Sequence, residues 1–144
     1  MNRVVAVLSD GLGSGIKANI LACMTSTMLL KFMESHFDIE KSCEIIMNSL
    51  PVCKVRGISY STFSAIDCFE NGRAKIVEEG NPDFIWIRNG EVLKPEYQSI
   101  QSKDFKNRKM KVYNIQLEKY DRIIFCSDGA TQVAMGSQKY PLDL

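Results

Sequence analysis

Histidine is nearly absent from this sequence, in which His36 is the only one among 144 residues. Catalysis by a serine–histidine–aspartate triad needs a histidine as general base, and zinc sites often use several histidine ligands. The sequence therefore predicts neither a histidine-dependent triad nor a metal site with several histidines. His36 comes at the end of a predicted helix, and we expect it at the surface.

The cysteines are odd in number and widely spaced, which fits neither a framework of disulfides nor a zinc knuckle. There are five, at positions Cys23, Cys43, Cys53, Cys68 and Cys126. Cys23, Cys68 and Cys126 lie in apolar runs, so we predict that they are small buried side chains. Free thiols are typical of a reducing compartment, which predicts a cytoplasmic location.

The sequence also lacks a long hydrophobic run and an excess of charge of one sign. Its apolar stretches are too short for a membrane span or a signal peptide, and the net charge is +1. We therefore expect no membrane contact from this domain and no nucleic-acid partner. A small basic run is predicted to be a solvated strand edge and loop: Lys103, Lys106, Arg108, Lys109 and Lys111.

The hydrophobic content of 45% is that of a globular domain, and the whole chain, 1–144, is predicted to be a single domain. Two segments of the same type stand out in it. The apolar run Val4–Leu8 leads into Ser9-Asp10-Gly11-Leu12-Gly13-Ser14-Gly15, and Ile123–Cys126 leads into Ser127-Asp128-Gly129. Both runs are predicted to be buried strands, and the first is predicted to be buried on both faces.

Two consecutive helices and a series of strands are expected between these segments. The helices are predicted from Ile16 to about Phe37 and from Ile39 or Glu40 to Leu50, with Ser14 as a possible cap of the first. The broad apolar face of the first helix is predicted to face the core: Ile16, Ile20, Met24, Thr27, Met28, Leu30 and Phe32. Strands are predicted at Tyr60–Phe69, Arg73–Glu79, Phe84–Ile87, Val92–Leu93, Lys111–Leu117 and Asp121–Cys126, with hairpin turns at Asn71-Gly72 and Asn89-Gly90. The fold class is therefore α+β, with mostly antiparallel sheets and two helices packed on them.

A strand that ends in Asp-Gly has three interpretations. The segment can form a simple turn, which is the simplest interpretation of Asp128 by itself. It can hold a hard cation such as Mg²⁺ or Mn²⁺, which prefers carboxylate and carbonyl oxygens. The glycines Gly11–Gly15 are also compatible with a nucleotide-binding loop, although Ile16 occupies the third fingerprint position and no acidic strand end follows.

Several segments, in order, resemble the PPM-type (type 2C) serine/threonine phosphatases, in particular the bacterial branch typified by the sporulation stage II protein E phosphatase. The run Leu8–Ala18 resembles the Asp-Gly-x-Gly-x-Gly metal-binding motif, and Ser61–Asp67 resembles the central strand. Glu79–Gly90 resembles the Gly-x-Pro hairpin region of that branch, and Asp121–Gly129 resembles its late strand with Ser-Asp-Gly. The resemblance covers nearly the whole chain.

The resemblance implies a site with two divalent cations, Mn²⁺ or Mg²⁺. Asp10 would bridge both ions, the Gly11 carbonyl would reach one, and Asp128 would bind one. A water activated by these ions would hydrolyse phosphoserine or phosphothreonine on a regulatory protein, in this branch typically a small anti-anti-sigma factor. By this resemblance, Asp10 and Asp128 are the expected catalytic residues.

Two acidic motifs of the family pattern have no counterpart here. The family uses a Gly-Asp pair on a strand before Asp10 and an Asp-Asp pair well after Ser-Asp-Gly, so the chain is expected to be truncated at both ends. With two ligands, we expect weak cation binding and little phosphatase activity from the isolated 144 residues. A non-catalytic protein-interaction module on the same fold stays open as an alternative, and uncovered sheet edges favour a homo-oligomer.

Overall fold

The structure, a computed structural model of the chain, describes residues 2–13, 15–50, 61–103 and 108–131. Three helices are present in these ranges: α1 (Ile16–Glu34), α2 (Ile39–Ser49) and the short α3 (Asp128–Thr131). The strands are β1 (Arg3–Gly11), β2 (Ser61–Phe69), β3 (Arg73–Glu79), β4 (Ile85–Arg88), β5 (Glu91–Leu93), β6 (Gln98–Gln101), β7 (Lys109–Gln116) and β8 (Arg122–Ile124). No helix in the described ranges combines the length and apolar composition needed to cross a bilayer.

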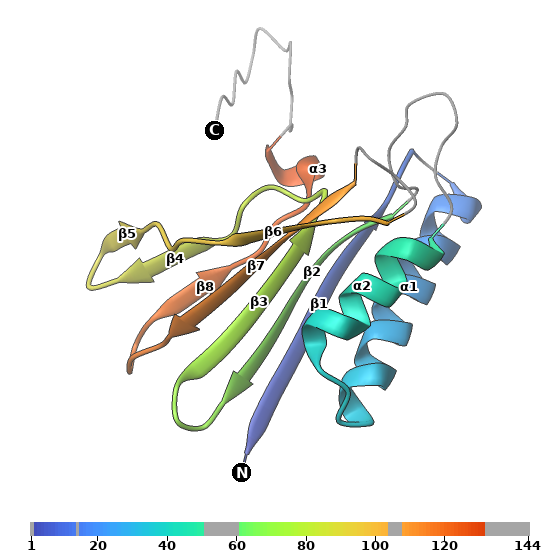
Figure 1. Ribbon diagram of the computed structural model, residues 1–144. Helices are drawn as coiled ribbons and strands as arrows, with labels where there is room; N and C mark the ends of the chain where they lie inside the picture. Colours follow the sequence, from blue (N-terminus) through green and yellow to red (C-terminus); the bar gives the residue numbers. More distant parts are fainter. Residues whose placement is uncertain (1, 14, 51–60, 104–107, 132–144) are drawn as a thin grey trace, which may run out of the picture.

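The strands form two sheets in which all neighbouring strands are antiparallel. The larger sheet has the order β1-β2-β3-β7-β6, and the smaller has the order β5-β4-β8. Helices α1 and α2 lie side by side over the β1 side of the larger sheet (Figure 1). This arrangement confirms the predicted α+β class with mostly antiparallel sheets.

Both predicted hairpin turns are present. Gly72 joins β2 to β3 with a φ of 82°, and Asn89 and Gly90 join β4 to β5 with φ values of 50° and 81°. Two consecutive residues with positive φ match the twist of antiparallel strands, which is why Asn-Gly is favoured at this position.

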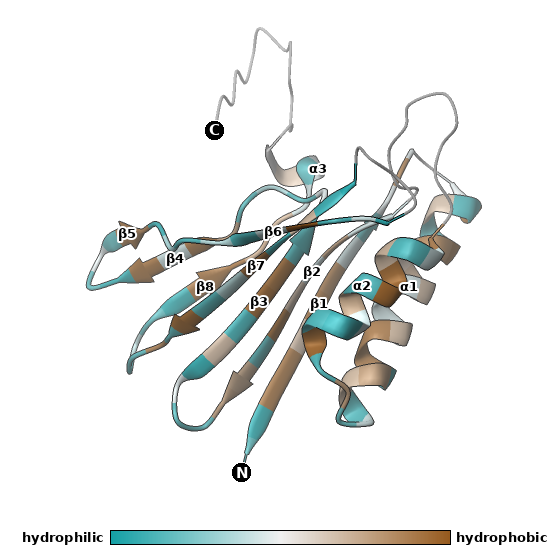
Figure 2. Cartoon of the chain, viewed as in Figure 1, coloured by the Kyte–Doolittle hydropathy of each residue, from teal (hydrophilic) through white to brown (hydrophobic). Residues whose placement is uncertain are grey.

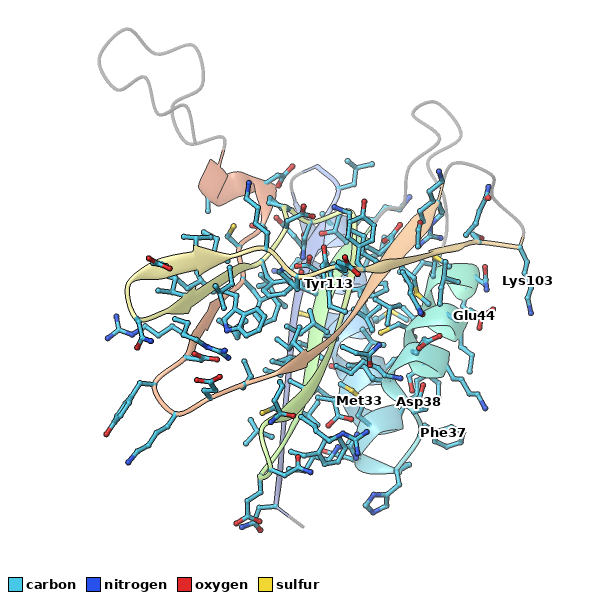
Figure 3. The ribbon with its side chains drawn as sticks, turned by 60° about the vertical axis from the view of Figure 1, so that its left-hand side comes forward. Met33, Phe37, Asp38, Glu44, Lys103 and Tyr113 are labelled. Carbon is cyan, nitrogen blue, oxygen red and sulfur yellow. The ribbon has the colours of Figure 1, made fainter. Side chains whose placement is uncertain are left out.

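Alternate residues of the larger sheet build two separate cores. Phe63, Ala65, Val77 and Val112 pack against buried residues of α1 and α2, among them Met33, which points from α1 toward the sheet in Figure 3. Their neighbours on the opposite face form a second core with the smaller sheet: Ile66, Ala74, Ile76, Tyr113 and Ile115, with Phe84 and Trp86. The period of two along β2, β3 and β7 thus places the larger sheet between the helices and the smaller sheet.

The smaller sheet is fixed by a cluster around Asp121. Both carboxylate oxygens of Asp121 accept hydrogen bonds from the Arg88 guanidinium, at 2.9 and 2.7 Å, and Oδ2 also accepts one from Trp86 Nε1 at 3.0 Å. The Arg88 guanidinium holds the pKa of Asp121 well below its usual range. This cluster joins β4 to the turn that leads into β8.

Strand β1 differs from its prediction, because it is not buried on both faces. It is an edge strand that pairs with β2, and Val4 is 67% exposed, whereas Val5 and Val7 pack on the helix side. A continuous apolar run is therefore half-buried here, since the smaller sheet packs on β2, β3 and β7 rather than on β1.

The predicted core face of α1 is also mostly wrong, although Phe32 packs against the core between the helices and the sheet. Thr25, Leu29 and Met33 are the buried residues of this helix, whereas Ile16 is 80% exposed and Ile20 and Met24 are each 51% exposed. Apolar residues occur on several sides of α1 (Figure 2), so periodicity alone could not identify the buried side. We call Ile16, Ile20, Met24 and Met28 the α1 stripe.

Smaller differences concern single residues and short elements. Cys23 is exposed and Cys68 and Cys126 are half-buried, so the prediction of buried thiols was wrong for Cys23, while Cys53 lies outside the described residues. His36 is exposed, as expected. Strand β6 and helix α3 were not predicted. Ser14, the predicted cap of the first helix, lies outside the described residues, and Gly15 is the N-cap residue of α1.

Candidate functional site

The two Ser-Asp-Gly segments lie at the same end of the molecule. Strand β1 ends there, β2 and β7 begin there, and the chain passes from β8 into α3 there (Figure 1). A cavity of about 510 Å³ opens between them, and its lining residues include Asp10, Gly11, Asp128 and Gly129. The structure thus brings together all three residues to which the resemblance gave a metal-binding role.

Asp10 is fixed by the backbone around it. Its Oδ1 accepts a hydrogen bond from the Gly11 amide at 2.8 Å, and its carbonyl oxygen accepts one from the Ser61 hydroxyl at 3.1 Å. The same hydroxyl lies 2.8 Å from that of Ser9. These contacts hold the turn from β1 into the glycine loop, which we call the Asp10–Gly11 turn.

Gly11 permits the close approach of this turn to helix α1. A Cβ atom on Gly11 would lie 2.2 Å from the carbonyl oxygen of Ala18, closer than any real contact. Gly13 and Gly15 have φ values of 85° and 96°, in the region that side chains disfavour. Gly11 is therefore needed for its close contact with α1, whereas Gly13 and Gly15 are needed for their positive φ values.

Asp128 occupies a different setting from the predicted one. β8 ends at Ile124, so Asp128 does not directly follow a strand but begins α3, whose Ala130 amide donates to the Ser127 carbonyl at 3.0 Å. It is also exposed. The prediction of a long buried strand up to Cys126 was wrong, since this strand is three residues long and Ile124 is 44% exposed.

A buried ion pair lines the same cavity and was missed by the sequence analysis. Arg108 Nε donates to Glu79 Oε1 at 3.1 Å, and Arg108 Nη1 donates to the Leu50 carbonyl at 3.4 Å. Both side chains are almost fully buried, which contradicts the prediction that Arg108 belongs to a solvated basic run. The sequence held one indication: Glu79 ends a strand next to Gly80, as Asp10 does next to Gly11.

The ion pair leaves one carboxylate oxygen without a partner. Within the described residues, Glu79 Oε2 is buried and has no hydrogen-bond partner. Burial raises the pKa of Glu79, and the guanidinium of Arg108 acts in the opposite direction. The Arg108 guanidinium balances the charge of this carboxylate, so the pair adds no net charge beside the two aspartates.

The donor set at this end fits a hard divalent cation. Asp10, Asp128 and the Gly11 carbonyl would supply oxygen ligands, which Mg²⁺ and Mn²⁺ prefer, and Mg²⁺ usually retains several waters. In the part of the chain that the structure describes, no group of three or more His, Cys, Asp or Glu side chains could hold a metal ion. Water and carbonyl oxygens would have to complete the coordination.

The fold disfavours the nucleotide-binding interpretation of Gly11–Gly15. That loop depends on a strand–helix–strand unit with parallel strands. Here β1 is followed by two helices and then by β2, which pairs with it antiparallel, and every described strand pair is antiparallel. The glycine loop therefore lies in a different topological context.

Comparison with known proteins identifies relatives of the chain. The family model described as "Stage II sporulation protein E (SpoIIE)" matches residues 1–142. Stage II sporulation protein E of Bacillus subtilis (strain 168) is 30% identical over 130 residues, which are 88% of this chain and 15% of that protein.

Solved structures share the fold. The PP2C phosphatase domain of SpoIIE from Bacillus subtilis, solved with a fragment of its regulatory domain, is similar with a TM-score of 0.74 and 24% identity, over 90% of this chain and 39% of that one. RsbX in complex with magnesium is similar with a TM-score of 0.66 and 23% identity, over 88% of this chain and 61% of that one. The chain thus spans less than two thirds of the length of each of these relatives.

Proposed function

The chain belongs to the stage II sporulation protein E family and shares the fold of the PP2C phosphatase domain of SpoIIE. From this premise we propose that it removes phosphate from phosphoserine or phosphothreonine on a regulatory protein. The observation that supports the proposal is the cavity shared by Asp10, Gly11 and Asp128. Among the relatives, RsbX was solved with magnesium. By the resemblance of the sequence to this branch of phosphatases, a phosphorylated protein of the anti-anti-sigma type is the proposed substrate class. The free thiols support a proposed cytoplasmic setting.

The residues of the cavity have separable roles in this proposal. Asp10, the Gly11 carbonyl and Asp128 hold divalent cations, which when bound act as Lewis acids and lower the pKa of water. Ser61 and the Gly11 amide orient Asp10. Arg108 neutralises Glu79, so that this buried carboxylate does not add to the negative charge of the site.

Binding of Mn²⁺ to the 144-residue chain, measured by isothermal titration calorimetry, tests the proposal. We expect weak binding that Asp10→Asn abolishes and that Glu91→Gln, an exposed carboxylate on β5, leaves unchanged. Mn²⁺-dependent hydrolysis of a phosphoserine peptide is then measured with the same three proteins. Binding that survives Asp10→Asn would contradict the assignment of Asp10.

A non-catalytic interaction module is the second candidate function. The observation in its favour is that, apart from Glu79, which is paired with Arg108, only two carboxylates of the described residues line the cavity, those of Asp10 and Asp128. The module predicts no Mn²⁺ binding and no hydrolysis by the wild-type chain. The calorimetric titration therefore separates the two candidates.

A further inference from the structure

A row of polar side chains connects the interior of the domain to the Asp10–Gly11 turn. Ser64 Oγ donates to Glu78 Oε1 at 3.2 Å, and Asn81 Nδ2 donates to Ser64 Oγ at 3.0 Å. Thr62 Oγ1 donates to Asn81 Oδ1 at 2.6 Å and lies 3.4 Å from the carbonyl oxygen of Asp10. We call these four side chains, Glu78, Ser64, Asn81 and Thr62, the polar relay.

The strand register and one glycine place the polar relay. Ser64 and Glu78 are direct partners across β2 and β3, and Thr62 is the partner of Asp10 across β1 and β2. Gly80 has a φ of 78°, and a Cβ atom there would lie 2.7 Å from the methyl group of Thr62. The chain therefore turns tightly after β3 and brings Asn81 back over β2.

The polar relay has a direction, because a hydroxyl carries a single hydrogen. As the structure orients it, Thr62 gives its hydrogen to Asn81, Asn81 donates to Ser64, and Ser64 donates to Glu78. This direction suits an ionised Glu78, which can only accept. The 3.4 Å approach of Thr62 to the Asp10 carbonyl then carries no well-formed hydrogen bond.

A proton on Glu78 allows the opposite direction throughout. Glu78, protonated from solvent, donates to Ser64, and Ser64 donates to the oxygen of an Asn81 amide rotated by half a turn. Asn81 nitrogen then donates to Thr62, and Thr62 donates to the Asp10 carbonyl. Every group keeps a partner in both directions, so the reversal needs only rotation of the Asn81 amide and a small shift of the Thr62 hydroxyl toward the Asp10 carbonyl.

The surroundings of Glu78 make both forms accessible near neutral pH. Glu78 is 3% exposed, and burial raises its pKa to about 7, against the lowering effect of the Phe84 amide and the Ser64 hydroxyl. Asp83 before β4 raises this pKa and Lys111 on β7 lowers it. Tyr113, labelled in Figure 3, also faces Glu78 from β7, and the Tyr97 ring lies 5.5 Å from that of Tyr113.

We propose that protonation of Glu78 reverses the polar relay and directs the Thr62 hydroxyl onto the Asp10 carbonyl, which makes Thr62 and Asn81 positioning residues for the Asp10–Gly11 turn. In the protonated form, the carbonyl accepts from both Ser61 and Thr62, so the turn is held more firmly. That the turn holds a divalent cation rests on the proposed function, whereas the reversal of the hydrogen bonds does not.

The reversal is tested without metal, by nuclear magnetic resonance. The carbonyl carbon shift of Asp10 and the side-chain carboxyl carbon shift of Glu78 are followed between pH 5 and 9 in the 144-residue chain. We expect one common midpoint in the wild type. In Glu78→Gln, which cannot ionise, the Asp10 carbonyl transition disappears. An Asp10 carbonyl that is independent of pH around the Glu78 midpoint, or that still titrates in Glu78→Gln, overturns the proposal.

A matched pair of variants at Thr62 separates the hydroxyl from packing. Thr62→Val keeps the methyl group beside Gly80 and removes the hydroxyl, whereas Thr62→Ser keeps the hydroxyl. We expect the Asp10 carbonyl to follow Glu78 in Thr62→Ser and to be uncoupled from it in Thr62→Val, in which Glu78 still titrates. Coupling that survives in Thr62→Val contradicts the proposal.

The affinity for Mn²⁺ tests the positioning role of Thr62, which depends on the proposed function, whereas the carbonyl titration does not depend on it. Loss of a group that orients a metal ligand typically weakens affinity at least about tenfold, so Thr62→Val is expected to bind Mn²⁺ about tenfold more weakly than Thr62→Ser. Equal affinities of the two variants contradict the positioning role. If no protein in the series binds Mn²⁺, the proposed function and the positioning of a cation site fail, while the carbonyl titration still decides the reversal.

Discussion

At the scale of the residue, buried charge is the distinctive feature of the candidate site. Glu78 and Glu79 are adjacent, yet each is buried in a different environment, one with Ser64 and one with Arg108. Alternation along β3 sends their side chains to opposite faces of the sheet. Two successive carboxylates thus influence stability through different partners.

Glu78 is expected to make stability fall as pH rises. Its pKa is about 7 in the folded chain, above the ordinary value of 4.5, so the folded state binds the proton more tightly than the unfolded state. The free energy of unfolding should therefore decrease between about pH 4.5 and 7, by about 2 kcal/mol. Urea denaturation at pH 5 and pH 8 measures it, and Glu78→Gln should lack this part of the pH dependence. An unchanged pH dependence in Glu78→Gln would show that Glu78 is not the group responsible.

Removing one partner of the Glu79–Arg108 pair should be costly. Arg108→Met leaves a buried carboxylate without its cation, which typically costs about 3–5 kcal/mol. The double variant with Glu79→Gln should lose less than the sum of the two single changes, as measured by denaturant unfolding. Lys31→Ala, which breaks an exposed pair with Glu34, serves as control and should cost less than about 0.5 kcal/mol.

At the scale of the element, short sequence motifs predicted the structure correctly where the backbone conformation of one or two residues determines it. The Asn71-Gly72 and Asn89-Gly90 hairpins were predicted correctly, because the positive φ of Gly72, Asn89 and Gly90 favours Gly and Asn at these positions. The two consecutive helices and the antiparallel sheets were also confirmed.

Tertiary packing decided the elements that the sequence could not specify. The buried side of α1 depends on how the helix lies on the sheet, and its apolar residues fit more than one side. The exposure of β1 depends on which strands the smaller sheet covers. Arg108 could not be distinguished from its solvated neighbours, since its partner Glu79 lies 29 residues away.

The junction of β1 and α1 depends on the absence of a side chain at Gly11. Gly11→Ala places a Cβ atom 2.2 Å from the Ala18 carbonyl, so strand and helix must move apart, at an expected cost of about 3 kcal/mol. Gly13→Ala has open space and meets only the strain of a positive φ, about 1 kcal/mol. Thermal unfolding of both variants measures the difference, and equal losses would rule out the contact as the cause.

At the scale of the whole molecule, the described residues leave the apolar side chains of the α1 stripe exposed. The α1 stripe runs along one side of a helix whose opposite side packs on the sheet. Contiguous apolar surface of this kind favours association. We expect sedimentation velocity to show a mass that increases with concentration, and Ile20→Lys with Met24→Lys to keep the chain monomeric. Val92→Lys, a 61% exposed residue on β5, is the control and should leave association unchanged.

Trp86 makes the two cores separately observable. It is the only tryptophan of the chain, and it lies in the core between the sheets with its indole nitrogen bonded to Asp121. Its fluorescence therefore reports the smaller sheet, whereas far-ultraviolet circular dichroism is dominated by α1 and α2 on the other side of the larger sheet. Coincident transitions of the two signals would show that the helical layer and the smaller sheet melt as one cooperative unit.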